Sequence, residues 1–371
     1  MKKYIFVPII LMLVTLLFSQ SIQAQELKTD VMVVVSDLEI LTGETLAMPI
    51  TTNSIAGDTG YIFFIGQNSK TGKLKWHLYN PFEKKMIKEG ECLFESCEFN
   101  AISTKGSFAL AFSQSEQKLW LLDINNGKWD EAYKNPEDNE AGLAFSTSNP
   151  FSFVSDTKAF AIFDQLNKKH TVTDTSIVEL TTAPFKYEEI IQVSKMMRKA
   201  VSTATGKDMP NPPYTMEYIQ FCDNRYFLCA YRSNENIKNK IPNSFLIYVT
   251  IKSPAIKLYE AEKQIMPLDL KADGSRQLFS IVSRQKGGLF LRENKKISKP
   301  LHGPSPIAGK VLKSGNVAAY AKDYATYDIY LGPVGAMKKV LTFARQYPVV
   351  FIDGVEKMAV IKDKTVSYYN L

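Results

Sequence analysis

Residues 272–280 read ADGSRQLFS, and two other stretches repeat this pattern: TKGSFALAF at 104–112 and KSGNVAAY at 313–320. Each begins with a polar turn that contains glycine and continues as a short apolar run. After a polar break, a second apolar run follows each of them: KLWLLD at 118–123, GLFL at 288–291 and YDIYL at 327–331. Short apolar runs separated by Gly, Asp and Asn are typical of β-hairpins. The sequence therefore predicts pairs of antiparallel strands that recur along the chain.

The turn that opens each unit recurs at a nearly regular interval. Successive turns are 39 to 50 residues apart, except for one interval of 68, and they lie at Asp58, Gly106, Asp156, Asn224, Gly274, Gly315 and Gly354. A period of about 40–50 residues is that of a β-propeller with four strands in each blade. We therefore expect an all-β protein, a single propeller of seven four-stranded blades over residues 25–371, with six or eight blades as the alternatives.

The two ends of the predicted ring are incomplete in complementary ways. The last unit contains only three strand-like runs, at 349–352, 357–361 and 365–369. Near the start, the apolar stretch VMVVV at 31–35 has no turn partner of its own. If this stretch supplies the outer strand of the last blade, the ring closes with a strand from each end and leaves no open sheet edge.

The repeated unit resembles the TolB-type propeller repeat, a WD-like pattern in which an Asp-Gly turn is followed by an apolar strand. The best matches are DGSR at 273–276 and YDIYL at 327–331. The resemblance implies a propeller fold and a role in protein interaction in the cell envelope.

The N-terminal residues have the features of a cleavable export signal. Lys2 and Lys3 precede an apolar run over residues 4–18, and Ile22 and Ala24 form a cleavage site. We predict a signal peptide over residues 1–24, cleaved after Ala24. The apolar run is shorter than the about 20 residues that a membrane span needs. We expect a periplasmic or secreted monomer with no membrane span after processing.

Charge and cysteine content restrict the partners and the cross-links. The formal charge of +7 is spread along the chain, without the basic stripe that nucleic-acid binding requires. In an exported protein, two local disulfides could form, Cys92–Cys97 and Cys222–Cys229, with free buried thiols as the alternative. No His lies at zinc-ligand spacing from either pair, and we expect no cofactor or metal.

The long interval between Asp156 and Asn224 indicates an insertion. Its apolar residues lie close to helical spacing, at Tyr187, Ile190, Ile191 and Met197. Gly206 and several prolines up to Pro213 follow. We predict a helical insertion at about 186–213, which either packs on the ring or forms a lid or partner-docking element.

Candidate ligand-binding residues come from the predicted connections between strands. His302 lies between two predicted blades, and Asp273, Asp323 and Asp353 lie at predicted turns. His77 is expected within a strand. The sequence contains no nucleophile elbow, phosphate-binding loop, metalloprotease helix or calcium loop.

Two functions from different classes remain. The first is a non-catalytic, exported binding or scaffold module for a protein, peptide or glycan. The alternative is a carbohydrate-active lyase or glycosidase, which would need paired carboxylates at the channel mouth. We favour the binding module.

Overall fold

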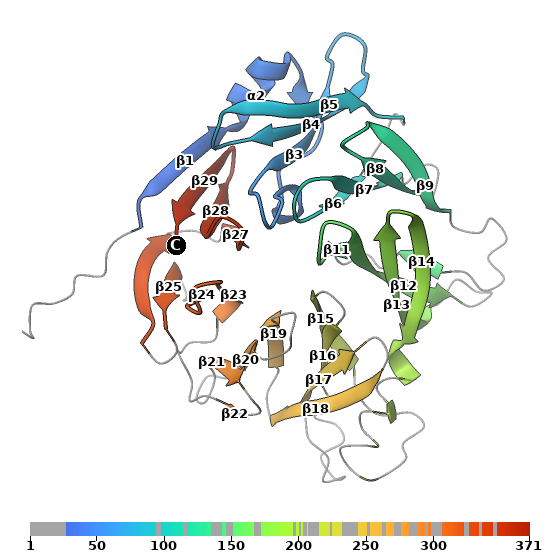
Figure 1. Ribbon diagram of the computed structural model, residues 1–371, viewed down its shortest axis with the longest axis vertical. Helices are drawn as coiled ribbons and strands as arrows, with labels where there is room; N and C mark the ends of the chain where they lie inside the picture. The colour runs from blue at the N-terminus through green and yellow to red at the C-terminus, as the bar shows by residue number, and fades with distance from the viewer. Residues whose placement is uncertain are drawn as a thin grey trace, which may run out of the picture.

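The computed structural model describes residues 27–93, 98–113, 118–134, 143–145, 151–166, 172–195, 198–199, 202, 206, 215–222, 225–231, 244–250, 253–261, 265–270, 276–281, 288–293, 296–297, 306–322, 326–333, 336–343 and 347–371. Within these residues the strands form seven antiparallel sheets, six of them with four strands and one with five. The sheets are arranged as blades around a central axis (Figure 1). The predicted all-β propeller is therefore confirmed.

The first four blades contain the strands from β2 to β18. Blade 1 consists of β2 (Thr45–Leu46), β3 (Ile62–Gln67), β4 (Leu74–Asn80) and β5 (Lys85–Glu91). Blade 2 consists of β6 (Glu98–Ile102), β7 (Phe108–Ser113), β8 (Lys118–Asp123) and β9 (Lys128–Lys134). Blade 3 consists of β10 (Leu143–Phe145), β11 (Phe151–Phe153), β12 (Lys158–Leu166), β13 (Val172–Thr182) and β14 (Phe185–Gln192). Blade 4 consists of β15 (Thr215–Cys222), β16 (Arg225–Tyr231), β17 (Ser244–Thr250) and β18 (Ser253–Ala261).

The last three blades complete the ring. Blade 5 consists of β19 (Ile265–Leu270), β20 (Arg276–Ile281), β21 (Gly288–Glu293) and β22 (Lys296–Ile297). Blade 6 consists of β23 (Pro306–Val311), β24 (Val317–Lys322), β25 (Tyr327–Gly332) and β26 (Lys338–Phe343). Blade 7 consists of β27 (Val349–Ile352), β28 (Lys357–Lys362), β29 (Thr365–Asn370) and β1 (Thr29–Val34). Between β1 and β3 lie the helix α2 (Val35–Thr42) and the short 3-10 helix η1 (Thr52–Ser54).

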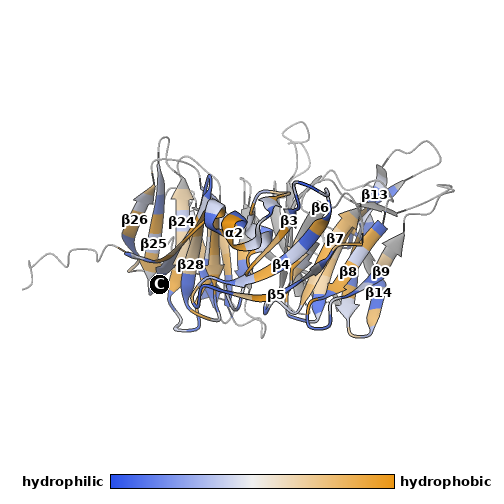
Figure 2. Ribbon diagram, turned by 90° about the horizontal axis from the view of Figure 1, so that it is seen from above, coloured by the Kyte–Doolittle hydropathy of each residue, from blue (hydrophilic) through white to orange (hydrophobic). Residues whose placement is uncertain are grey.

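The second strand of a blade is buried on both faces, because a neighbouring blade packs on each side. Ala109, Ala159 and Ala318 in β7, β12 and β24 have no exposed surface. Burial on both faces explains why these strands read as continuous apolar runs. The small alanine side chains also let neighbouring sheets approach closely. Seen from the side, hydrophilic residues gather at the turns on the faces of the ring and hydrophobic ones in the strands (Figure 2).

The ring is closed by strands from the two ends of the chain. β1 pairs antiparallel with β29, with Val33 opposite Val366 and Val34 opposite Thr365. Asp30 of β1 also accepts a hydrogen bond from the ammonium of Lys357 in β28, at 2.6 Å. The predicted closure is confirmed, although the strand starts at Thr29 and ends at Val34, and Val35 already belongs to α2.

The predicted turn residues that the structure describes lie between the first two strands of their blades, and some of them hold neighbouring blades together. The N–H of Asp353 in blade 7 donates to the carbonyl of Gly57 in blade 1, at 3.1 Å. The N–H of Asp58 donates in turn to Thr104 of blade 2, at 2.7 Å. A Cβ at Gly354 would lie 1.9 Å from the carbonyl oxygen of Asp58. Only glycine therefore allows this contact between blades 7 and 1.

The predicted helical insertion is wrong over its first residues. Residues 185–192 form β14, the outer strand of blade 3, paired with β13. Ile177 faces Ile191 and Val178 faces Glu189, so Ile190 is bulged out of the register. A bulge interrupts the two-residue alternation of a strand, which is why Tyr187, Ile190 and Ile191 resemble a helical spacing. Helical residues begin after this strand, at 193–195, 198–199 and 202, and Met197 lies outside the described residues.

We predict that the closed ring depends on β1. Deleting residues 25–36 should expose the edge of β29, lower the melting temperature and promote aggregation, because unpaired strand edges associate. Thermal unfolding and size-exclusion chromatography would measure both effects. A truncated protein that stays monomeric with unchanged stability would mean that β1 does not close the ring.

Two neighbouring positions of β1 provide a matched pair of variants for the same prediction. Val33 is 5% exposed and Met32 is 59% exposed. Val33→Asp should reduce the free energy of unfolding by about 3 kcal/mol, because it buries an unpaired charge. Met32→Asp should change it by less than about 0.5 kcal/mol.

Candidate functional site

A pocket of about 380 Å³ lies at the innermost strands of the ring. It is formed by Thr52 of η1 together with β19, β23 and β27, which border the centre of the ring (Figure 1). An innermost strand pairs on one side only, so its other edge presents backbone N–H and C=O groups toward the centre. The volume is within the range of natural small-ligand sites. This central pocket is the candidate functional site.

The central pocket combines apolar side chains with one carboxylate, that of Asp269, and one positive charge, that of Lys310. Leu268, Val349 and Phe351 contribute apolar surface. Asp269 also lines the pocket, and its carboxylate accepts a hydrogen bond from the N–H of Val311 at 2.6 Å. Lys310 is half-buried, and its ammonium makes no ion pair with any residue that the structure describes. The pocket is therefore suited to a ligand that has both an apolar part and a negative charge.

Of the four residues predicted for a ligand face, the structure describes only Asp353. It lies in the turn after β27, and its backbone N–H holds blade 1. Asp273, Asp323 and His302 lie outside the described residues. The predicted convergence of these side chains therefore stays a prediction.

The carboxylate of Asp156, at one of the predicted turns, serves the fold. Asp156 accepts hydrogen bonds from the Ser103 hydroxyl at 2.7 Å and from the N–H groups of Lys105 and Ser107 at 3.1 and 3.4 Å. Asp156 belongs to blade 3 and its three donors to blade 2, so this one side chain fixes the contact between two blades. The sequence predicts a turn at Asp156, but it does not indicate the contact with Ser103, which lies 53 positions away.

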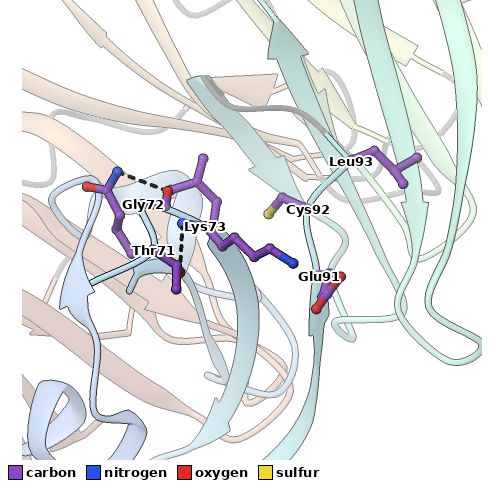
Figure 3. A pocket seen from close by; sticks show the side chains of 8 residues that line it. Thr71, Gly72, Lys73, Glu91, Cys92 and Leu93 are labelled. Atoms are coloured by element: carbon purple, nitrogen blue, oxygen red, sulfur yellow. Dashed lines mark hydrogen bonds between the residues drawn. The ribbon is translucent and has the colours of Figure 1, made fainter. Parts of the chain in front are cut away.

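A second pocket, of about 570 Å³, lies where the β3–β4 turn approaches the end of β5 (Figure 3). The side chain of Lys73 extends from the turn toward Glu91 and Cys92. Gly72 has φ 71°, a left-handed conformation that suits glycine in this turn. Its carbonyl accepts a hydrogen bond from the Gln67 amide at 3.2 Å.

The predicted disulfides are not supported by the described residues. Cys92 is a free thiol, and Cys97 lies outside the described part of the chain. On the β15–β16 hairpin, Cys222 faces Arg225 and Cys229 faces Tyr218. These positions are four residues apart along the strands, roughly 13 Å at 3.3 Å per residue. A disulfide requires Cα atoms within about 7 Å, so this register excludes a Cys222–Cys229 bridge.

A buried hydrogen bond in blade 1 was not predicted from the sequence. His77 lies in β4, as predicted, and its Nε2 is 2.8 Å from the carboxylate of Glu44. The side chains are only 1% and 4% exposed. On the other side of the imidazole ring, Nδ1 of His77 lies 3.4 Å from the carboxylate of Glu89. Because Glu44 follows α2, the pair fastens the segment after the closing strand β1 to blade 1.

We predict that Gly66 is required for this hydrogen bond between His77 and Glu44. A Cβ at Gly66 would lie 2.4 Å from Oε2 of Glu44 and 3.2 Å from Nε2 of His77. Gly66→Ala should reduce the free energy of unfolding by about 1–3 kcal/mol, since the carboxylate cannot retreat without leaving His77. Gly57→Ala is the matched control, because its Cβ would meet nothing within 4 Å. Equal stability of the two variants in urea would contradict the role given to Gly66.

A further prediction concerns the thiol of Cys92. Burial and the nearby negative charge of Glu44 raise the pKa of this thiol from 9.0 to about 12. At pH 8 the native thiol should react with iodoacetamide at least about 100-fold more slowly than in urea, because the thiolate is the nucleophile. Peptide mapping by mass spectrometry would measure both rates for Cys92 alone.

The raised pKa of Cys92 also predicts how this residue's contribution to stability depends on pH. The unfolded thiol loses its proton above about pH 9, whereas the folded thiol keeps it up to about pH 12. The contribution of Cys92 to stability should therefore be complete below pH 9 and decline as the pH rises toward 12. Equal alkylation rates for native and unfolded protein would contradict the raised pKa.

The described residues contain no group of three or more His, Cys, Asp and Glu side chains suited to a metal ion. Nor does this part of the chain include a helix of the length and apolar character needed to cross a membrane.

Comparison with known proteins identifies the class of fold. No protein-family model matches the sequence, and no curated protein matches it either. An oligogalacturonate lyase from Vibrio parahaemolyticus has a similar structure, with a TM-score of 0.56 and 13% identity over 93% of this chain and 96% of the lyase. YCF48 from Cyanidioschyzon merolae gives a TM-score of 0.50 and 11% identity over 88% of this chain and 95% of that one.

A longer enzyme also contains the fold. Porphyromonas gingivalis dipeptidyl peptidase 4 gives a TM-score of 0.52 and 10% identity, and the match covers 92% of this chain but only 61% of the peptidase. At these identities the likeness establishes a β-propeller and assigns no activity.

Proposed function

We propose that this chain is an exported β-propeller that binds a protein, peptide or glycan partner in the cell envelope or outside the cell. The central pocket carries this proposal. Its half-buried Lys310 has no carboxylate partner among the described residues, and a lysine that is partly desolvated without compensation favours an incoming anion. The apolar side chains beside it supply the contact area.

Three further features support a binding role. The repeated turns resemble those of TolB-type propellers, for which protein interaction in the cell envelope is the implied role. The N-terminal sequence is typical of an export signal. The carboxylates of Asp156, in a turn, and Asp269, in β19, accept backbone N–H groups, rather than standing as a pair such as glycosidic hydrolysis needs. We therefore favour binding over the carbohydrate-active alternative.

The segment that follows β14 is a candidate for partner choice. It begins after Gln192, where the outer strand of blade 3 ends, so its residues are additional to the sheet. At its start, Ser194 is anchored through its N–H, which donates to the carboxylate of Asp174 at 3.1 Å. An added segment that leaves all strands of the blade in place can vary at little cost in chain entropy.

We predict that Lys310 determines the affinity for the partner. Once a partner has been captured from the envelope fraction of the native cell, Lys310→Glu should weaken its binding at least about 10-fold, because attraction becomes repulsion inside the pocket. Isothermal titration calorimetry with the purified partner would measure the change.

Lys313→Glu is the matched control for this experiment. It makes the same charge change at an exposed residue of the neighbouring turn, and it should alter the affinity less than about 2-fold. Equal losses for the two variants would mean that overall charge, and not the central pocket, governs binding.

A further inference from the structure

Lys362, the last residue of β28, places its ammonium among three aromatic rings. Its Nζ lies 4.9 Å from the centroid of the Phe343 ring, 5.9 Å from that of Tyr369 and 6.0 Å from that of Tyr347. The rings come from the end of β26, the connection to β27, and β29. We call these three residues the aromatic cage.

The cage belongs to the hydrophobic core between blades 6 and 7 of the propeller. Phe343 and Tyr369 are 6% and 4% exposed. The Phe343 ring meets Tyr347 edge-on at 6.3 Å and Tyr369 at 6.2 Å, with interplanar angles of 83° and 68°. Lys362 and Tyr347 are half-buried, so one side of the cage is open to solvent. The cage is therefore rigid on two sides and accessible on the third.

The other lysine of β28, Lys357, has oxygen acceptors around its ammonium that Lys362 does not have among the described residues. Lys357 contacts the Phe82 ring, at 5.4 Å, but its ammonium also donates to the carboxylate of Asp30 and to the side-chain carbonyl of Asn370. Lys362 donates only to the Tyr369 hydroxyl, at 3.2 Å, among the described residues. An ammonium carries three N–H donors, and only one of them has a hydrogen-bond acceptor within the described part of the chain.

This chemistry fits a cation without N–H groups better than it fits lysine. A quaternary ammonium is attracted to the faces of the rings in the same way and loses no hydrogen bond on leaving water. We propose that the aromatic cage is a binding site for methylated ammonium groups, and that Lys362 occupies it in the absence of such a ligand. This site is separate from the central pocket, and the proposal does not depend on the partner bound there.

The occupancy by Lys362 sets the expected affinities. A cation–π contact that is partly exposed to solvent would reduce the affinity for a competing cation about 5-fold. Replacing Lys362 by Ala should therefore tighten the binding of tetramethylammonium about 5-fold over the wild type. Saturation-transfer NMR on the ligand methyl protons detects such weak binding, and a titration gives the affinity.

Two variants control the experiment. Lys364→Ala removes the same charge at an exposed lysine two residues away and should bind tetramethylammonium as the wild type does. The double variant Phe343→Ala, Lys362→Ala should lose the gain, because the ring at the shortest distance is gone. Circular dichroism and the melting temperature would establish that each variant is folded.

Three outcomes would overturn the proposal. They are a folded Lys362→Ala variant that binds no tighter than the wild type, an equal gain in the Lys364→Ala variant, and a gain that survives the loss of Phe343. If Lys362→Ala does not fold, Lys362→Gln replaces it, because Gln keeps part of the aliphatic stem and removes the charge. The same comparison with Lys364→Gln then decides.

Discussion

β1 and β29 come from opposite ends of the chain, and the hydrogen bonds between them turn a row of sheets into a closed ring. Every blade of a propeller is packed between two others, so an opening at one place would expose both an apolar blade face and a strand edge. Other contacts reinforce this junction. Tyr368 donates its hydroxyl proton to the carbonyl of Gly60 at 2.8 Å, and burial raises the pKa of that phenol well above its ordinary value.

The central pocket exists only because the ring is closed. Its residues come from blades 1, 5, 6 and 7, and blades 1 and 7 meet at the junction that β1 completes. The position of Lys310 against Val349 and Phe351 is therefore set by tertiary packing and by no local motif. The aromatic cage has the same origin, since its rings come from blades 6 and 7.

The features that could be predicted from the sequence are those with a local signal. Turn residues such as Gly106 and Gly315 recur at the blade period, and the unpaired stretch at 31–35 matched a missing strand. The pairing of Glu44 with His77 spans 33 positions, with no spacing rule to reveal it. A bulge at Ile190 changed the alternation of β14 into an apparent helical spacing. The cage could not be found either, because Phe343 and Tyr369 become neighbours only through the packing of two blades.

The bond between Asp30 and Lys357 joins residues that are 327 positions apart. β1 is the first described strand to be synthesised, and we expect it to be among the last to find its partner, because β29 lies at the other end of the chain. Contacts of such long range form late, after the entropy of closing the intervening chain has been lost. Weakening β1 would therefore act mainly on the rate of unfolding and leave the rate of folding nearly unchanged. The lifetime of the native ring is thus governed by its first strand.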